Sequence, residues 1–333
     1  MVCTQKYKQI QTKVCTPVNF FELFMSEILN TLTTLRDYMR WASSLFTAEK
    51  LSFGQGTTTA LDEAVALVLY AVNQPYHLSA NFFDCVLTLE ERQTVFDLIE
   101  RRINERIPAA YLTKESIFMN LPFYVDERVL IPRSPVAELI EQRFEPWVEE
   151  ESVEHILDLC TGSGCIAIAC AYAFPNAMVD AVDLSSEALE VAEINIEKHH
   201  TQESVTTYYS DLFNKLPPTK YDIIISNPPY VCLNEWENLP PEFHAEPDMA
   251  FKGGTSGLDL VLRILSNAKA YLSEHGILVV EVGSSSETLQ NLLPDVPFYW
   301  LNFERGGDGV FLLTADQVSD FHDTFTNALK KHH

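Results

Sequence analysis

Runs of β-branched and other apolar residues alternate with helical patterns through the second half of the chain, and this alternation constrains the fold more than any other feature. Each run has the length of a buried strand, and together they cover segments 155–159, 177–182, 205–209, 221–226 and 276–282. Apolar residues at helical spacing fill the intervals 166–173, 186–198 and 258–272. A chain that alternates in this way is predicted to form a doubly wound α/β domain with a mainly parallel sheet.

The last part of the chain departs from this alternation. Two further β-rich runs, 298–303 and 309–313, flank Gly306-Gly307-Asp308, which is a hairpin signal. We therefore expect a terminal antiparallel hairpin at one edge of the otherwise parallel sheet.

The first third of the chain carries only helical patterns. Apolar residues recur at spacings of one, three and four from residue 20 to about residue 106, and glycine and proline residues punctuate them. The pattern begins with Phe20, Phe21, Phe24, Ile28, Leu32, Leu35 and Tyr38, and we expect its aromatic residues to form the core. We assign residues 1–112 to a helical domain, residues 113–135, which contain two β-rich runs, to a connecting β-hairpin, and residues 136–333 to the α/β domain.

The chain is strongly acidic. Lys and Arg number 23 and Asp and Glu number 47, which gives a formal net charge of −24. A field of this sign repels phosphate backbones, so we expect no stable nucleic-acid binding and favour a basic protein partner.

Other features of the composition indicate a cytoplasmic protein. No apolar run reaches the ~18 residues that a membrane span needs, and no apolar core of a signal peptide follows the first lysines. The seven cysteines are odd in number, scattered and without a C-x-x-C pair. We therefore predict reduced thiols in the cytoplasm, no membrane association and no bound metal.

A turn of unusual composition, Asn227-Pro228-Pro229-Tyr230, follows the predicted strand at 221–226. Its prolines rigidify the turn and remove two N–H donors. The Asn227 side-chain oxygen and the Pro228 carbonyl are two acceptors, and the Tyr230 ring is a flat face. Such a turn can bind a planar group that carries an –NH2, although an ordinary proline-rich loop has the same composition. We take all four residues as candidate substrate-binding residues, and Asn227, Pro228 and Tyr230 as candidate catalytic residues.

Glycine-rich and acidic residues at the ends of three strands predict a cofactor site. The glycines after the first strand let the backbone approach a ligand at the start of a helix. Asp183, after the second strand, can accept from both hydroxyls of a ribose, and it can equally cap the next helix. Asp211 can bind an adenine amino group with Phe213 against the ring, unless this segment is only a strand-end turn. The candidate cofactor-binding residues are Asp158, Thr161, Gly162, Ser163, Gly164, Asp183, Asp211, Leu212, Phe213 and Asn227.

The third glycine of a dinucleotide-binding fingerprint is replaced by Ala167, which disfavours a nicotinamide cofactor. With all its motifs in place, the chain instead resembles the protein-(glutamine-N5) methyltransferases, which modify translation proteins. The resemblance covers most of the chain and implies the class I fold of S-adenosylmethionine-dependent methyltransferases, in which a mainly parallel sheet ends in an antiparallel hairpin. It is carried, in this order, by segments 106–111, 123–133, 158–164 and 227–230, and by Glu246-Pro247 followed by Gly253-Gly254 and Gly257-Leu258-Asp259.

This family has two main branches, which methylate different proteins. One acts on the Gln of the Gly-Gly-Gln loop of peptide release factors, and the other on a Gln of the large-subunit ribosomal protein L-three. The release-factor branch typically has Pro-Arg-Pro-Glu-Thr-Glu after the hairpin and a Gly in the cofactor loop, where this chain has Ser134-Pro135 and Cys160. Both departures, and the longer N-terminal region, are similar to the ribosomal-protein branch.

The resemblance therefore implies S-adenosylmethionine as cofactor, S-adenosylhomocysteine as product and the basic ribosomal protein L-three as substrate. The helical domain is the candidate docking site, on its position alone. Two other interpretations stay open. The same slot occurs in N6-adenine DNA methyltransferases, since adenine carries a conjugated –NH2, but the acidic charge disfavours a DNA channel. A ribosome-assembly adaptor on an inactive methyltransferase fold would not need the slot and cofactor residues that this chain has.

Overall fold

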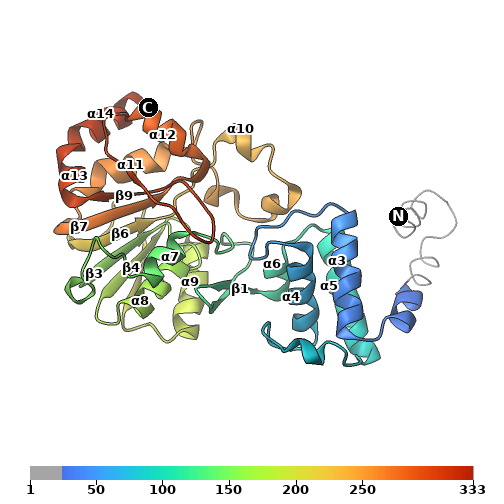
Figure 1. Cartoon of the computed structure of the whole chain (residues 1–333). Coiled ribbons are helices and arrows are strands. Elements are labelled where there is room, and N and C mark those ends of the chain that lie inside the picture. Colours follow the sequence, from blue (N-terminus) through green and yellow to red (C-terminus); the bar gives the residue numbers. More distant parts are fainter. Residues whose placement is uncertain (1–24, 333) are drawn as a thin grey trace. The chain divides into compact units, whose positions relative to one another are not determined.

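The computed structural model describes residues 25–332. These residues form two compact units, and the chain passes from the first to the second between Lys114 and Glu115 (Figure 1). Phe20, Phe21 and Phe24 of the predicted helical pattern lie outside the described residues.

The N-terminal unit is built from helices. Residues 25–31 are helical, and they are followed by α3 Leu35–Ala48, α4 Ala60–Ala71, η1 Ala80–Phe82, α5 Leu89–Asn104 and α6 Ala109–Thr113. The helical pattern in the sequence runs without interruption to Tyr38, but the helix breaks before Leu35 because Thr34 caps α3. The Thr34 hydroxyl accepts from the Asp37 N–H and the Asp37 carboxylate accepts from the Thr34 N–H, which closes a capping box.

Side chains from α3, α4 and α5 form the core of this unit. Its buried members include Tyr38, Phe46, Leu67, Val68, Phe96 and Ile99. The expectation that the aromatic residues are core residues is correct for Tyr38, Phe46 and Phe96. It is wrong for Tyr70, Tyr76 and Phe82, which are about half exposed.

In the described part of the second unit, seven strands form one mixed sheet in the order β5-β4-β3-β6-β7-β9-β8. The strands are β3 His155–Leu159, β4 Met178–Asp183, β5 Val205–Tyr209, β6 Tyr221–Ser226, β7 Leu272–Glu281, β8 Tyr299–Trp300 and β9 Val310–Thr314. Neighbouring strands from β5 to β7 are parallel, whereas β9 is antiparallel to both β7 and β8. The predicted mainly parallel sheet with a terminal antiparallel hairpin is thus confirmed.

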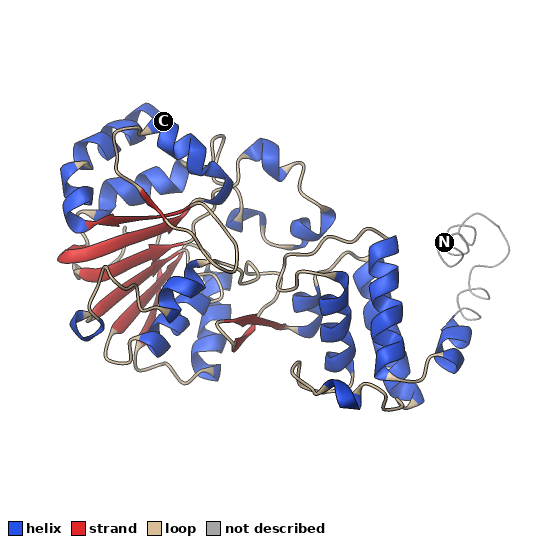
Figure 2. Cartoon of the chain, in the orientation of Figure 1, coloured by secondary structure: helices blue, strands red, loops and turns tan. Residues whose placement is uncertain are grey.

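Helices cover both faces of this sheet (Figure 2). One face packs against α7 Val136–Glu141, α8 Cys165–Ala173 and α9 Ser186–Lys198, and the other against α11 Asp259–Ala268, α12 Ser286–Leu292, α13 Ala315–Asp320 and α14 His322–His332. Successive residues of a strand point to opposite faces. In β6, Ile223 and Ile225 join the first layer and Ile224 joins the second. Because both faces are buried, the central strands are continuous apolar runs in the sequence.

A two-stranded antiparallel hairpin, β1 Glu115–Phe118 and β2 Leu121–Tyr124, opens the second unit. It is shorter than the predicted range 113–135, and residues 125–135 of that range contain no strand. The Asp126 carboxylate accepts from the Arg128 N–H at 3.1 Å and from the Arg128 guanidinium at 2.9 Å, and these bonds fold the chain into a turn. Short helices in the loops complete the unit: η2 Glu150–Ser152, α10 Leu233–Trp236, η3 Pro241–Ala245, η4 Asp248–Ala250 and η5 Gly283–Ser285. Among the described helices, none has both the length and the apolar character that crossing a membrane requires.

Candidate active site

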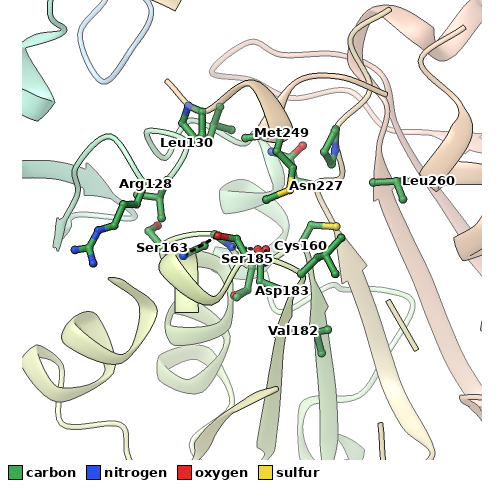
Figure 3. Close-up of a pocket in the computed structure, with 18 of the residues that line it drawn as sticks. Arg128, Leu130, Cys160, Ser163, Val182, Asp183, Ser185, Asn227, Met249 and Leu260 are labelled. Carbon is green, nitrogen blue, oxygen red and sulfur yellow. Dashed lines mark hydrogen bonds between the residues drawn. The ribbon is translucent and has the colours of Figure 1, made fainter. Parts of the chain in front are cut away.

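A pocket of about 1070 Å³ lies at the carboxyl ends of the parallel strands (Figure 3). Its floor comes from the loops that follow β3, β4, β5 and β6, because the carboxyl ends of parallel strands meet at one edge of the sheet. The strand order reverses between β3 and β6, which is where α/β sheets bind ligands. The segment 127–134 without Ile131, the segment 247–252 without Phe251, and the start of α11 also line the pocket.

The loop after β3 forms part of the wall of this pocket. Cys160, Gly162 and Gly164 have φ angles of 62°, 54° and 79°, in the left-handed region that favours glycine. Cys160, Thr161, Gly162 and Ser163 line the pocket. Gly164 does not; a Cβ at this position would lie 3.2 Å from the Ala192 Cβ, so Gly164 lets α8 start close to α9.

Asp158 holds this loop from below and does not line the pocket. It is fully buried, and its Oδ2 accepts from the Thr161 hydroxyl at 2.6 Å and from the Ala167 N–H at 3.2 Å. Its Oδ1 is buried and has no hydrogen-bond partner among the described residues. Burial raises the pKa of Asp158 to about 7, although its hydrogen bonds with Thr161 and Ala167 act in the opposite direction.

Asp183 ends β4 and points into the pocket, where Figure 3 shows it beside Ser163 and Ser185. Its two carboxylate oxygens accept from the Gly162 N–H and the Ser185 N–H, each at 2.9 Å. Ser185, and not Asp183, caps α9, since the Ser185 hydroxyl accepts from the Ala188 N–H. Burial raises the pKa of Asp183, and its bonds to backbone N–H groups oppose this rise. The side chain therefore joins the glycine loop to the next strand while it faces the pocket.

The residues after β5 divide between the pocket and the core. Asp211 and Leu212 line the pocket. Asp211 also forms an ion pair of 2.8 Å with Arg263 on α11, a pocket residue that the sequence analysis did not identify. Phe213 is not among the lining residues; it is buried and stacks on Tyr271, with the ring centroids 4.7 Å apart.

The Asn227–Tyr230 turn lies at the edge of the same pocket. Asn227 and Pro229 line it, whereas Pro228 is buried and Tyr230 is partly buried without lining it. The Tyr230 hydroxyl donates to Glu281 at 2.9 Å. Burial raises the pKa of Tyr230, and the neighbouring Glu281 carboxylate raises it further.

Glycines from the neighbouring segments pack directly on this turn. A Cβ on Gly253 would lie 2.6 Å from the Pro229 carbonyl oxygen and 2.8 Å from the Tyr230 Cα, so only a glycine fits there. Residues 251–253 also pair with Val231: its N–H donates to the Phe251 carbonyl at 2.8 Å, and its carbonyl accepts from the Gly253 N–H at 3.0 Å. The turn is therefore fixed by backbone contacts.

Every basic side chain that lines the pocket is paired with a carboxylate. Arg263 pairs with Asp211, Lys252 with Asp248, Arg133 with Glu246, and Arg128 with Asp126 and Glu190. Glu127, Asp183, Glu187 and Asp259 add further acidic groups. The pocket thus carries excess negative charge, which favours a cationic ligand and disfavours a phosphate backbone.

Arg133 and Glu246 join the two segments that face the strand ends. The fully buried Glu246 carboxylate accepts from the Arg133 guanidinium at 2.9 and 3.1 Å and from the Ile131 N–H at 2.9 Å. Arg133 also lies over the Phe243 and Phe251 rings, 5.6 and 5.7 Å from their centroids. Both residues belong to segments that carry the family resemblance, but their contact joins positions 113 residues apart and could not be read from the sequence.

Comparison with known proteins identifies close relatives. The family model described as the methyltransferase small domain matches residues 143–238. The ribosomal protein uL3 glutamine methyltransferase of Francisella tularensis is 45% identical over 306 residues, which are 92% of this chain and 98% of that protein. The protein of the same name from Bordetella pertussis is 45% identical over 289 residues, which are 86% of this chain and 97% of that protein. A solved methyltransferase structure from Pyrococcus furiosus aligns with 69% of this chain and 99% of its own, at 14% identity and a TM-score of 0.43.

The two alignments cover almost the whole length of both relatives, so the similarity is not limited to the methyltransferase small domain. Identity at this level over nearly complete chains establishes a common family, and it agrees with the family predicted from the motifs. The chain belongs to the ribosomal protein uL3 glutamine methyltransferase family.

Proposed function

We propose that this protein transfers a methyl group from S-adenosylmethionine to the side-chain amide nitrogen of a glutamine in ribosomal protein uL3, the protein L-three of the sequence analysis. The observation that carries the proposal is the position of the Asn227–Tyr230 turn on the rim of a pocket that Asp183 and the glycine loop also line. The names and the 45% identity of the two relatives support uL3 as the substrate.

The residues of the pocket fit S-adenosylmethionine. The loop at 160–163 lines the pocket and offers backbone atoms there, and Asp183 offers a carboxylate that is already oriented by two backbone N–H groups. A sulfonium is a cation, and the excess negative charge of the pocket suits it. We assign the binding of this cofactor to Thr161, Gly162, Ser163, Asp183, Asp211, Leu212 and Asn227, with Asp158 and Gly164 as supports of the loop. When bound, S-adenosylmethionine supplies the electrophilic methyl group.

The turn can bind the substrate amide in the way that the chemistry requires. An amide nitrogen is a weak nucleophile because its lone pair is delocalised into the carbonyl, and positive charge builds on it as it leaves the amide plane. The Asn227 side-chain oxygen and the Pro228 carbonyl accept its two N–H groups, orient it and stabilise this charge. Tyr230 borders the slot. No strong base is needed, since the nitrogen becomes acidic only after methyl transfer.

A methyl-transfer assay tests the proposal. The enzyme is incubated with labelled S-adenosylmethionine and, separately, with purified uL3, a release factor and duplex DNA, and the label is mapped by mass spectrometry. Label on a glutamine of uL3 alone supports the proposal. Label on the release factor, on DNA or on no substrate contradicts it, and the last result would favour the adaptor.

We also propose that the N-terminal helical unit docks the protein substrate. Its loop between α4 and α5 exposes Tyr76, Phe82 and Val86, with exposed fractions of 55%, 55% and 67%, and long loops with exposed apolar side chains are frequent binding sites. Replacing Phe82 and Val86 by Ser should raise KM for uL3 and leave kcat unchanged. An unchanged KM would contradict this assignment.

A further inference from the structure

A buried carboxylate lies behind the substrate turn, and nothing in the proposed chemistry has used it so far. Glu281 is the last residue of β7 and is only 5% exposed. Its Oε1 accepts from the Tyr230 hydroxyl at 2.9 Å, and its Oε2 accepts from the Ser134 hydroxyl at 2.6 Å. Both oxygens thus accept from neutral hydroxyl donors, which is the pattern of an ionised carboxylate.

Tyr230 is held by more than this hydrogen bond. Its carbonyl accepts from the Ser285 hydroxyl at 2.8 Å. A Cβ on Gly257 would overlap that carbonyl, and a Cβ on Gly283 would overlap the Tyr230 ring. The ring therefore lies against bare backbone on one side, and its hydroxyl end is fixed by Glu281. The direction of the ring is set by these contacts before any substrate binds.

Stability does not require this arrangement. Burying an ionisable group costs free energy, and an apolar side chain of similar volume usually serves a core as well or better. Burial raises the pKa of Glu281, which reflects this cost, and the hydrogen bonds from Ser134 and Tyr230 oppose the rise. A costly buried group next to a substrate slot is a reason to look for a function.

We propose that Glu281 is a positioning residue for the methyl transfer: it fixes the ring of Tyr230 at the slot, and Ser134 holds Glu281 in place. The inference rests on the proposed function. It also gives a role to Ser134, one of the positions where this chain departs from the release-factor branch. No proton moves in this role, because Tyr230 and Ser134 stay the donors and Glu281 stays the acceptor.

The charge of Glu281 adds an electrostatic effect to the positioning. A carboxylate that accepts from a phenol increases the electron density of the aromatic ring. The face of an electron-rich ring attracts positive charge, and this attraction is strongest where water is excluded. In the proposed reaction positive charge builds on the substrate nitrogen, so the Glu281–Tyr230 pair would favour the transition state over the bound amide.

The test is a double-mutant cycle on the intact protein. Tyr230→Phe removes the hydroxyl, and Glu281→Gln keeps the size of the side chain but removes its charge. We expect each change to lower kcat about tenfold, with KM changed less than about threefold. The double variant should be no slower than either single variant, because the two residues act through one contact. Ser134→Ala should lower kcat by a smaller factor, and Ser134→Thr should restore it.

A matched control lies at the start of β6, the strand that leads into the Asn227–Tyr230 turn. The Tyr221 hydroxyl donates to Asp180 at 2.7 Å, a second phenol–carboxylate pair, at the opposite end of β6 from the turn. Tyr221→Phe removes a buried hydroxyl and its hydrogen bond with Asp180. It should therefore destabilise the fold and leave kcat unchanged. Multiplicative losses in the cycle, or a loss in Tyr221→Phe equal to that in Tyr230→Phe, would show that Glu281 serves only the fold and would overturn the proposal.

A second measurement needs no substrate. In protein labelled with 3-fluorotyrosine, the fluorine resonance of Tyr230 is the one that Tyr230→Phe removes. Glu281→Gln and Ser134→Ala should shift and sharpen this resonance, Ser134→Thr should return it, and Tyr221→Phe should not affect it. If the wild-type enzyme methylates nothing, the proposed function fails, and the fluorine spectrum still decides whether Glu281 fixes the ring. A Tyr230 resonance that is identical in Glu281→Gln overturns the inference.

Discussion

Asn227 is the residue on which the proposed transfer depends most, because its side-chain oxygen is one of two acceptors that the turn offers to an amide. Asn227→Ala removes this acceptor and leaves the glycine loop and Asp183 in place. We expect kcat to fall about 10²-fold or more, on the scale of losing one preorganised electrostatic partner. The dissociation constant for S-adenosylhomocysteine, measured by calorimetry, should change much less. Turnover close to wild type would exclude the assigned role of Asn227.

Asp158 gives a prediction about pH. Its pKa in the folded protein is raised to about 7 by burial, from an ordinary value of 3.8. Stability from a carboxyl group with a raised pKa is fully present below about pH 4 and is lost as the pH rises through 7. Asp158→Asn keeps an acceptor for Thr161 and Ala167 and cannot ionise. Urea unfolding should show that wild type loses roughly 2–4 kcal/mol relative to this variant between pH 4 and pH 8. Parallel pH profiles for the two proteins would contradict the assignment.

The sequence predicted the position of some site residues in the fold and not that of others. Asn227 and Asp183 directly follow strands, and the carboxyl ends of parallel strands converge, so their meeting at one pocket follows from topology. Phe213 could not be placed in this way, because the left-handed Leu212, with a φ of 50°, turns the chain and sends Phe213 into the core. Glu281 could not be identified either, since its importance comes from Ser134 and Tyr230, which are 147 and 51 residues away.

At the scale of elements, the sequence predicted which segments form strands better than it predicted the residues at which these strands begin and end. The predicted strand 221–226 has the same bounds as β6 in the structure, because apolar side chains of β6 pack into the layers on both faces of the sheet. β7 starts at Leu272, four residues before the predicted start, since Leu272 pairs with Tyr221 across a bulge that apolar periodicity does not show. The break before α3 had a signal in Thr34 and Asp37, whose spacing is that of a capping box.

The hairpin, α9 and the glycine loop are joined by one buried side chain. Asn195 is fully buried in α9; its Oδ1 accepts from the Tyr124 N–H at 2.7 Å, and its Nδ2 donates to the Tyr124 and Ser163 carbonyls at 3.0 and 2.9 Å. Asn195→Leu fills a similar volume but leaves these backbone groups unpaired. We expect it to lower the free energy of unfolding by about 2–4 kcal/mol.

The matched control for this prediction is Asn267→Leu, since the Asn267 side chain is exposed and donates to the Arg263 carbonyl within its own helix. Its free energy of unfolding should change by less than about 0.5 kcal/mol. The free energies of unfolding of both variants and of the wild type are measured by denaturant titration. Equal effects at the two sites would mean that Asn195 does not join these elements.

At the scale of the whole molecule, charge is the property that most narrows the choice of substrate. The net charge of −24 and the pairing of every basic side chain in the pocket both act against a phosphate backbone. The same charge attracts a basic protein. This interpretation needed only the composition, whereas the pairing of Arg128, Arg133, Lys252 and Arg263 with carboxylates needed the structure.

If this attraction guides the substrate to the enzyme, the reaction should depend on salt in a specific way. Raising the ionic strength from about 0.05 to 0.5 M shortens the screening length several-fold and weakens long-range attraction. We therefore expect kcat/KM for intact uL3 to fall about tenfold or more, with kcat unchanged, because steering acts on the encounter and not on methyl transfer. A short, nearly neutral peptide around the target glutamine should show little dependence on salt. Equal salt dependence of the protein and the peptide, or none for either, would mean that the acidic surface does not recruit the substrate.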